Sequence, residues 1–278
     1  MTPMGAMKTL VLGGYGNFGA RICRALVSDE ATRPHMALLV AGRDALQAKA
    51  LADALGHGAQ GVALDHQAPG LAATLREWGV GLLIHTAGPF QAQAYNVAQA
   101  AAEAGAHYID LAGGRRFVCD FPAAMQAAFT AAGRTAITGA STVPALSSAV
   151  IDHLCAGWQH INSIDICIAP AQRAPRGQAT LAAVLSYCGL PIDVWDGGKW
   201  RPHSGWARPS PVQFQRLRPR LGRSATSRTW RSFPPTTRPA TASPSARPWR
   251  SAWRREPLPP WQRCAAGAYC PTPKSWPG

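Results

Sequence analysis

The sequence predicts an α/β protein built on a doubly wound parallel sheet, and three observations lead to this fold class. Short apolar runs alternate with segments of helical spacing over the first 160 residues. A turn with almost no side chains joins the first apolar run to the first helix. No stretch reaches the roughly 18 apolar residues of a membrane span, so the apolar runs are core segments. Such alternation implies right-handed crossovers with helices on both faces of the sheet.

Each element has its own signal in the sequence. The first apolar run precedes a segment in which Ile22, Ala25 and Leu26 recur at helical spacing. The later segments repeat this order of apolar run and helical pattern. The expected strands are residues 7–12, 37–41, 61–64, 80–84, 107–111 and 135–138, and the expected helices are residues 20–27, 71–78, 93–104, 117–132 and 145–156.

The turn after the first strand carries the pattern G-x-G-x-x-G, in the strand–turn–helix order of a Rossmann-type dinucleotide-binding domain. Gly14 permits a tight turn, Gly16 lets the backbone approach a pyrophosphate, and Gly19 lets the helix pack on the strand. The helix directs its positive end toward the anion. This interpretation requires that the backbone amides of the turn face the diphosphate and not neighbouring carbonyl groups. The candidate pyrophosphate-binding residues are Gly13, Gly14, Tyr15, Gly16, Asn17, Phe18 and Gly19.

The second strand ends in Gly42-Arg43-Asp44, where the adenosine ribose of a bound cofactor is expected. A guanidinium at this place pairs with a 2′-phosphate, whereas an acidic side chain would bond a free 2′-hydroxyl. Arg43 therefore favours NADP over NAD, although a solvated charge at a strand end is the simpler alternative. Asp44 is expected to be the N-cap of the next helix, with Gln47 completing a capping box.

The loop after the fourth strand should flank the cofactor near its nicotinamide, because binding crevices form at the carboxyl ends of parallel strands. Its candidate residues are Ala87, Gly88, Pro89 and Phe90. His85 at the strand end is either an acid–base group or a hydrogen-bonded part of the scaffold. Further along, Pro144 is expected in a first helical turn, with Ser141 or Thr142 as cap. No catalytic residue is assigned.

Three regions are expected along the chain. Residues 1–160 form the NAD(P)-binding domain, and residues 161–206 begin a second, substrate or dimerisation domain. This second region reads as a strand over 163–168, a helix over 177–187 and a turn-rich stretch over 189–206. One strand and one helix cannot bury their own apolar faces, so this domain is expected to be incomplete. The cleft between the domains is the expected substrate site.

Charge is distributed unevenly. Residues 1–200 hold 13 basic and 13 acidic side chains, whereas the remaining 78 residues hold 15 basic side chains and one acid, Glu256. A neutral body argues against nucleic-acid binding by the folded part. The seven cysteines show no metal-type spacing, so no metal site is expected and a reducing compartment fits best. The beginning of the sequence leaves no room for a leader before the first strand, which favours the cytoplasm.

Several segments together resemble the saccharopine dehydrogenase-like family of NAD(P)-dependent oxidoreductases over roughly residues 7–206. They are the glycine turn 13–19, Ala41-Gly42-Arg43, Thr86-Ala87-Gly88-Pro89-Phe90, Tyr108-Ile109-Asp110-Leu111, and Gly139-Ala140-Ser141 with Pro144. The resemblance implies a Rossmann domain, an α/β substrate domain and hydride transfer at an imine or carbonyl carbon. It also implies that Gly14, Gly16 and Gly19 hold the pyrophosphate, Arg43 the adenosine end, and residues 87–90 the nicotinamide side.

Residues 207–278 depart from this family, because they lack Ile, Met, Asn and Asp while Arg, Pro, Ser and Trp are abundant. One explanation is a disordered basic tail that contacts nucleic acid or acidic partners. The other is translation out of frame: a shifted frame over 223–234 permits Leu-Cys-Asp-Val-Pro-Asp-Leu-Ala-Leu-Phe-Pro, similar to the family's second domain. A substrate domain cut short in this way would leave cofactor binding without turnover.

The expected function is that of an oxidoreductase with NADP or NAD as cofactor and a small molecule as substrate. A short-chain dehydrogenase is disfavoured, because no tyrosine is followed by lysine four positions later. A non-catalytic dinucleotide-binding regulator is the alternative from another class. No membrane partner is expected, nucleic acid is expected only through the tail, and a homodimer stays open.

Overall fold

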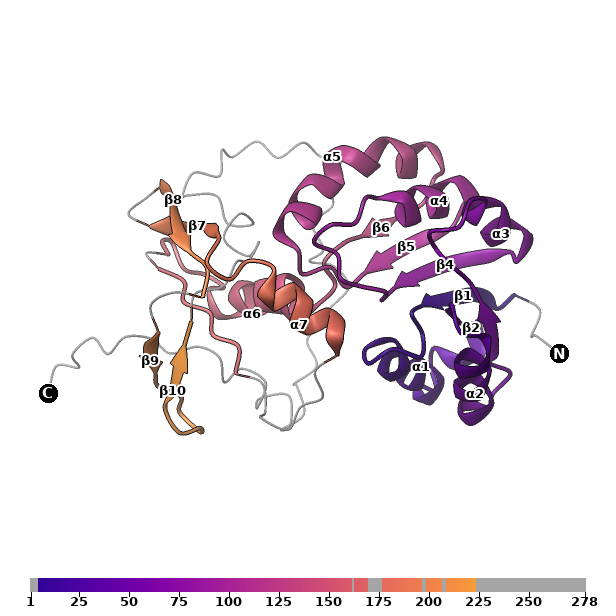
Figure 1. Ribbon diagram of the computed structural model, residues 1–278, viewed down its shortest axis with the longest axis horizontal. Helices are drawn as coiled ribbons and strands as arrows, with labels where there is room; N and C mark the ends of the chain where they lie inside the picture. Colours follow the sequence, from indigo (N-terminus) through magenta and orange to yellow (C-terminus); the bar gives the residue numbers. More distant parts are fainter. Residues whose placement is uncertain (1–4, 162, 170–176, 197–198, 207–208, 224–278) are drawn as a thin grey trace, which may run out of the picture. The chain divides into compact units, whose positions relative to one another are not determined.

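The structure is a computed structural model that describes residues 5–161, 163–169, 177–196, 199–206 and 209–223 (Figure 1). These residues fall into two compact units. The first unit comprises the described residues up to 146 together with 177–186, and the second comprises the other described residues. The expected domain border near residue 160 differs from this division, since helix α6 (Ser147–Leu154) groups with the second unit.

The first unit is built on one sheet of parallel strands in the order β3-β2-β1-β4-β5-β6. The strand order reverses between β1 and β4, which lie side by side, so the sheet is doubly wound as expected. All six expected strands are confirmed within one or two residues at their ends. Their bounds are β1 Met7–Leu12, β2 Met36–Gly42, β3 Gln60–Ala63, β4 Val80–His85, β5 His107–Asp110 and β6 Ala136–Ile137.

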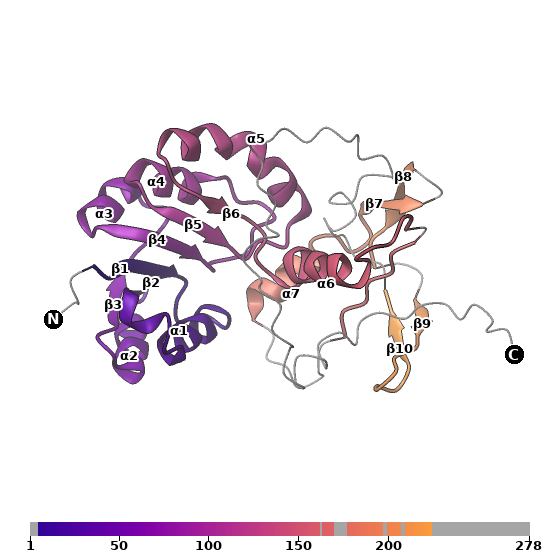
Figure 2. The same cartoon turned by 180° about the vertical axis from the view of Figure 1, so that it is seen from behind.

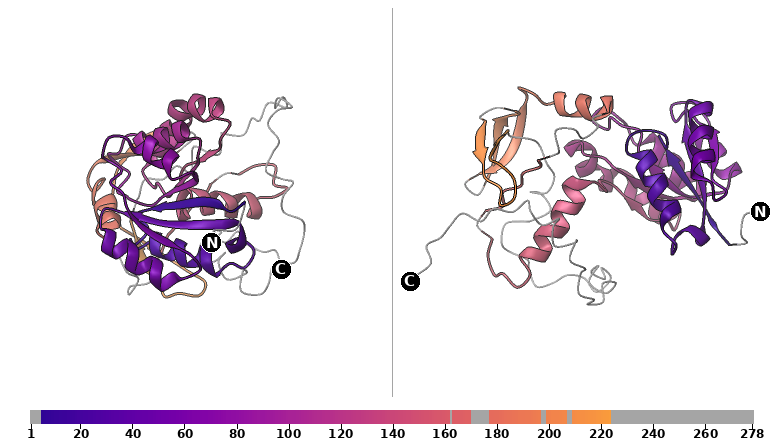
Figure 3. Two further views of the ribbon diagram at one scale, coloured as in Figure 1. Left: turned by 90° about the vertical axis from the view of Figure 1, so that its right-hand side faces the viewer. Right: turned by 90° about the horizontal axis from the view of Figure 1, so that it is seen from below.

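Helices cover both faces of this sheet. Figure 1 shows α1 (Gly19–Ser28) and α2 (Ala45–Leu55) on one face, and α3 (Leu71–Glu77), α4 (Asn96–Ala104) and α5 (Arg115–Ala131) on the other. A single 3₁₀ turn, η1 (Arg33–His35), leads into β2. The same layers are visible from behind in Figure 2 and from two further sides in Figure 3.

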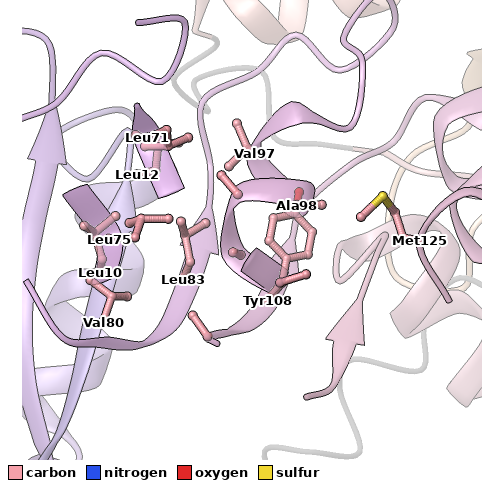
Figure 4. Packing of buried hydrophobic residues seen from close by; sticks show 14 of the residues in the cluster. Leu10, Leu12, Leu71, Leu75, Val80, Leu83, Val97, Ala98, Tyr108 and Met125 are labelled. Atoms are coloured by element: carbon pink, nitrogen blue, oxygen red, sulfur yellow. The ribbon is translucent and has the colours of Figure 1, made fainter. Parts of the chain in front are cut away.

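The core of the first unit consists of two apolar clusters, one on each face of the sheet. Leu10 and Leu12 belong to the cluster under α3, α4 and α5, while Val11 between them belongs to the cluster under α1 and α2. Successive side chains of a strand point to opposite faces, so a strand buried on both faces must be apolar throughout. In the larger cluster Leu83 lies between Leu10 and Tyr108 (Figure 4).

Two helix starts differ from the sequence-based expectation. Helix α4 begins at Asn96 and not at 93, which leaves Gln93 in the preceding loop. Pro144 does not lie in the first turn of a regular helix, because Val143 is extended (φ −130°, ψ 120°) and α6 begins at Ser147. The Ser141 hydroxyl donates to the Val143 carbonyl oxygen at 2.7 Å, whereas the expected N-cap bond has the hydroxyl oxygen accepting from an amide.

The second unit contains two antiparallel strand pairs. β7 (Pro191–Asp196) pairs with β8 (Lys199–Ser204), and β9 (Ser210–Val212) pairs with β10 (Arg220–Gly222). The turn-rich structure expected over 189–206 is therefore wrong: alternating side chains make a strand pair in which the Trp195 and Trp200 rings lie 5.2 Å apart. The strands β9 and β10 occupy the start of the expected tail, of which 207–208 and 224–278 lie outside the described residues.

The strand expected over 163–168 is also wrong, because these residues lie in no regular element. Their alternating pattern fits a strand, but among the described residues no strand pairs with this segment. A lone extended segment leaves its backbone groups without ladder bonds, which is why the pattern alone does not suffice. The helix expected over 177–187 is confirmed with shorter ends as α7 (Gln178–Leu185), and it groups with the first unit.

Candidate cofactor site

The candidate site lies at the carboxyl edge of the large sheet, where the strand order reverses. The glycine turn follows β1, and the loop that begins at Thr86 follows β4, the direct neighbour of β1 (Figure 1). Thr86 joins the two segments: its amide donates to Leu12 O at 2.9 Å, and its hydroxyl oxygen lies 2.8 Å from Leu12 O and 3.1 Å from Gly13 O. The sequence-predicted pyrophosphate and nicotinamide segments are therefore neighbours.

The glycines of the turn leave no room for side chains. A Cβ added at Gly19 would overlap the carbonyl oxygen of Gly13 and approach Gly14 Cα to 2.8 Å. A Cβ at Gly14 would lie 2.8 Å from Val11 O, and Gly13 has a positive φ of 76°. Helix α1 therefore starts directly against the turn, as the spacing of the glycines predicts.

Most of the glycine amides in the turn bond to neighbouring carbonyl groups, contrary to expectation. Gly13 N and Gly14 N both donate to Ala41 O at 2.9 Å, and Gly16 N donates to Gly13 O at 2.9 Å. The glycine pattern shows that the turn is tight, but it does not show where each N–H group points. The expectation that the glycine amides are bare is therefore wrong for Gly14 and Gly16.

Amides at the start of α1 remain for an anion. In the part of the chain that the structure describes, no backbone hydrogen bond uses the amides of Phe18 and Gly19. Phe18 is the N-cap, it makes no side-chain cap bond, and the first turn of α1 holds no acidic residue. The positive end of the helix dipole is thus uncompensated, which favours a phosphate at this place. The residues present fit the pyrophosphate of a dinucleotide.

Tyr15 packs against the tip of β2, where the sequence predicts the adenosine end of a cofactor. Its ring lies against Gly42 at the tip of β2, where an added Cβ would overlap the ring. Its hydroxyl oxygen accepts the amide of Asp44 at 3.0 Å. Phe18, by contrast, is half exposed and touches solvent at the helix start. The sequence predicted that Tyr15 and Phe18 both belong to one phosphate-binding turn. In the structure, Tyr15 contacts the tip of β2, whereas Phe18 is the exposed N-cap of α1.

Asp44 is the N-cap of α2, as expected. Its Oδ1 accepts the amides of Leu46 at 2.9 Å and Gln47 at 3.1 Å. The capping box differs in one respect, because Gln47 Nε2 donates to Asp44 Oδ2 at 2.8 Å while the Asp44 amide donates to Tyr15. The hydrogen bonds from Gln47 lower the pKa of the Asp44 carboxyl. This carboxylate is committed to the helix and is not free for a ribose hydroxyl.

Arg43 lies exposed beyond the tip of β2. The neighbouring strand β3 is held to this tip by the bond from Leu64 N to Gly42 O at 2.8 Å. His66 follows β3, and burial together with the positive charge of Arg43 lowers the pKa of its ring. His66 is a residue of this edge that the sequence reasoning missed, because a single histidine in a loop carries no pattern.

The loop after β4 is held by a side chain that sequence reasoning also missed. Gln93 Nε2 donates to the carbonyl oxygens of Ala87 at 2.8 Å and Pro89 at 2.9 Å. Phe90 is buried, and its ring packs edge-on against His85 at 4.9 Å between centroids. The candidate residues Ala87, Gly88, Pro89 and Phe90 thus form a fixed loop beside the glycine turn.

His85 belongs to the scaffold of this loop. Its side chain is 1% exposed, and its Nε2 lies 3.1 Å from Gln93 Oε1. Burial lowers the pKa of the ring to about 4, so the ring is neutral at physiological pH. A neutral, enclosed imidazole that is bonded to the scaffold favours the structural interpretation of His85 over an acid–base role.

Asp110 ties together the loops that follow β5 and β6. Its Oδ1 accepts the amide of Ala112 at 2.9 Å, the hydroxyl of Thr138 at 3.0 Å and the amide of Gly139 at 2.8 Å. Burial raises the pKa of this carboxyl, and the bond from Gly139 opposes the rise. Tyr108, two residues earlier on the same face of β5, is also buried. Both residues shape the edge of the site from within.

The described residues hold no group of three or more His, Cys, Asp or Glu side chains arranged for a metal ion. Within the same part of the chain, no helix has the length and apolar character needed to cross a membrane.

The first half of the chain is similar to a known family of proteins. The model of the saccharopine dehydrogenase NADP binding domain matches residues 9–137. None of the curated proteins compared with the chain matches it. Among solved structures, apo saccharopine dehydrogenase (L-Glu forming) from Saccharomyces cerevisiae aligns with 16% identity and a TM-score of 0.49, covering 75% of this chain and 47% of that enzyme. The aligned part thus spans about half of the yeast enzyme's length.

Two further solved structures align less completely. The 3-hydroxyacyl-CoA dehydrogenase type-2 from Mycobacterium avium has 19% identity and a TM-score of 0.37, over 48% of this chain and 72% of that one. Biliverdin reductase from Synechocystis, solved with biliverdin and NADP+, has 15% identity and a TM-score of 0.36, over 54% of this chain and 42% of that one. The family match, the strand order and the glycine turn agree: residues 9–137 form a Rossmann-type domain that is similar to the saccharopine dehydrogenase NADP binding domain.

Proposed function

We propose that this chain is an NADP-dependent oxidoreductase of the saccharopine dehydrogenase-like group, transferring a hydride between the cofactor and an imine, a carbonyl or an amino-acid-derived substrate. The observation that carries the proposal is the juxtaposition at the carboxyl edge of β1 and β4. There the start of α1 has no side-chain cap and is suited to bind an anion, and the 86–90 loop lies beside the glycine turn. A bound nicotinamide supplies the hydride, and the protein supplies position and shelter from water.

The preference for NADP over NAD rests on the side chains beyond β2. Arg43 is exposed at this tip, and Asp44, the one acid beside it in the sequence, is committed to capping α2. A guanidinium pairs with a ribose 2′-phosphate, whereas NAD binding commonly uses a free carboxylate for the 2′-hydroxyl. Within this proposal, the start of α1 at Phe18 and Gly19 binds the pyrophosphate next to the 13–19 turn, Arg43 binds the 2′-phosphate, and residues 87–90 contact the nicotinamide half.

Titration of the purified chain with NADPH and NADH tests this proposal. Arg43→Ala is expected to weaken NADPH binding by about 10- to 100-fold, the value of a charge-assisted pair, and to leave NADH binding unchanged. Arg116→Ala, which removes an exposed arginine on α5, serves as the matched control. Unchanged NADPH preference in Arg43→Ala would remove the 2′-phosphate role, and binding of neither nucleotide by the parent chain would remove the function.

A dinucleotide-binding regulator without turnover is the second candidate, and one observation favours it. The titratable side chains His85, Tyr108 and Asp110 at this edge are all buried, and His85 and Asp110 are bonded to the scaffold. The two functions separate in one assay. NADPH oxidation with imine or carbonyl substrates derived from amino acids supports the enzyme, while tight NADPH binding with no oxidation across such a set supports the regulator.

The partners of the chain follow from the same site. We propose a small molecule as substrate of the folded part and a homodimer as the assembly in solution, to be checked by light scattering. Nucleic acid is proposed to contact only the basic tail, whose residues 224–278 lie outside the described part. Binding to nucleic acid that is weakened by salt and absent after deletion of residues 207–278 would support this contact.

A further inference from the structure

Gln93 holds the loop after β4 from one side. Its amide nitrogen donates to two carbonyl oxygens of the loop, Ala87 O at 2.8 Å and Pro89 O at 2.9 Å. Its own backbone amide bonds Phe90 O at 3.4 Å. One side chain thus fixes the direction of the carbonyl groups of the residues on either side of Gly88, which itself adds no side chain to stiffen the loop.

His85 fixes the orientation of the Gln93 amide. The Nε2 atom of His85 lies 3.1 Å from Gln93 Oε1, and Oε1 can only accept a hydrogen bond. His85 therefore donates through Nε2, which places the Nε2 donor group of Gln93 toward the loop carbonyls. The ring is enclosed by Phe90 at 4.9 Å, His66 at 5.8 Å and Tyr108 at 6.3 Å between ring centroids. Packing from three sides keeps the imidazole in this orientation.

The other end of the loop is fixed to the glycine turn. The Thr86 hydroxyl oxygen lies within 3.1 Å of both Leu12 O and Gly13 O. The loop is therefore held at its start by the phosphate-binding turn and at its middle by Gln93. Residues between two such anchors keep one backbone conformation, and a site that is already ordered loses less entropy when a ligand binds.

We propose that Gln93, oriented by His85, is a positioning residue that holds the backbone of residues 87–90 in the conformation that receives the nicotinamide half of the cofactor. The inference rests on the proposed NADP site, because that site gives the loop its ligand. It assigns no role to Gln93 in the chemical step. It predicts that loss of this side chain affects ligands with a nicotinamide and spares ligands that occupy only the adenosine end.

The test compares two ligands, NADPH and adenosine 2′,5′-bisphosphate, by calorimetric titration. Gln93→Leu removes both bonds to the loop carbonyls and is expected to weaken NADPH binding by about tenfold. Binding of the bisphosphate is expected to change by less than about twofold. Gln91→Leu is the matched control: it changes the same residue type in the same loop, at a side chain whose Oε1 has no hydrogen-bond partner. It is expected to bind both ligands as the parent does.

Two variants of His85 separate positioning from packing. His85→Gln retains an N–H group at about the same distance from the backbone and is expected to keep NADPH binding within about twofold of the parent. His85→Leu fills the space without a donor and is expected to lose about as much NADPH affinity as Gln93→Leu. The melting temperature of each variant is measured alongside.

The outcomes are distinct. A folded Gln93→Leu that binds NADPH like the parent overturns the inference, and so does an equal loss for NADPH and the bisphosphate. Equal behaviour of His85→Gln and His85→Leu overturns the role given to His85. If the parent chain binds neither ligand, the proposed function fails. If the parent and Gln93→Leu both bind the two ligands with the same affinity, only the inference about Gln93 fails.

Discussion

The two units of this chain use their strands in different ways. In the first unit, parallel strands are buried under helices on both faces, and side chains such as Leu75 and Leu83 are fully enclosed. In the second unit, the described strands form two separate antiparallel pairs, and Leu221 in β10 is 72% exposed. A strand is stabilised by what covers its faces, so stability should be concentrated in the first unit.

The distribution of buried apolar side chains also differs between the two units. Both core clusters lie in the first unit. Among the described residues of the second unit, the buried apolar side chains are Ile151, Ile164 and Ile192, and they belong to neither cluster. The candidate cofactor site therefore lies on the unit that contains both core clusters.

Matched leucine truncations give the largest expected difference between the units. Leu75 in α3 is 0% exposed and Leu221 in β10 is 72% exposed. Leu75→Ala is expected to lower the free energy of unfolding by about 2–5 kcal/mol, because it leaves a cavity in the larger cluster. Leu221→Ala is expected to change it by less than about 0.5 kcal/mol. Urea denaturation followed by circular dichroism measures both, and similar losses would contradict the contrast.

The buried His85 should make the stability of the first unit depend on pH. The folded pKa of His85 is about 4, below its unfolded value, so between these values the unfolded chain binds the extra proton. The contribution of His85 to the free energy of unfolding is therefore constant above about pH 6.5. As the pH drops to about 4, this contribution decreases by about 3 kcal/mol. Denaturation curves at pH 7 and pH 4 should show a smaller loss for His85→Gln. An identical loss in the parent and the variant would show that other groups cause it.

Two buried glycines test whether the cofactor site belongs to the first unit alone. A Cβ at Gly19 would overlap Gly13 O, and a Cβ at Gly205 in the second unit would overlap Tyr187 O. Each substitution to Ala is expected to cost about 1–3 kcal/mol through overpacking. Only Gly19→Ala should also abolish NADPH binding, because it displaces the start of α1. Loss of binding in Gly205→Ala would show that the second unit supports the site.

Much of the first unit could be predicted because its signals are local. The apolar runs located every strand of the large sheet, and the helical spacing located α1, α3, α4 and α5. The Asp44 cap needs only a carboxylate followed by two free amides, so the sequence predicts it directly. The position of the glycine turn at the carboxyl edge, beside the 86–90 loop, follows from the order of the strands.

The second unit was harder to predict because its pattern is ambiguous. The residues of β7 and β8 include Pro191, Pro202 and flanking glycines, which are typical of turns, yet the segment forms a strand pair. Residues 163–168 show the opposite case, a strand-like alternation without a partner strand among the described residues. Pairing depends on a second segment, and no single stretch of sequence contains that information.

The sequence by itself determined the positions of the strands along the chain, the glycine turn and the placement of Arg43 beyond β2, since these depend on periodicity and on residue size. Only the tertiary structure decided which amides face an anion. Gly14 N and Gly16 N are used by Ala41 O and Gly13 O, while the start of α1 stays open. It also decided that Gln93 and His85 hold the loop after β4. Hydrogen bonds between segments depend on atomic positions that the whole fold sets, and residue patterns do not record them.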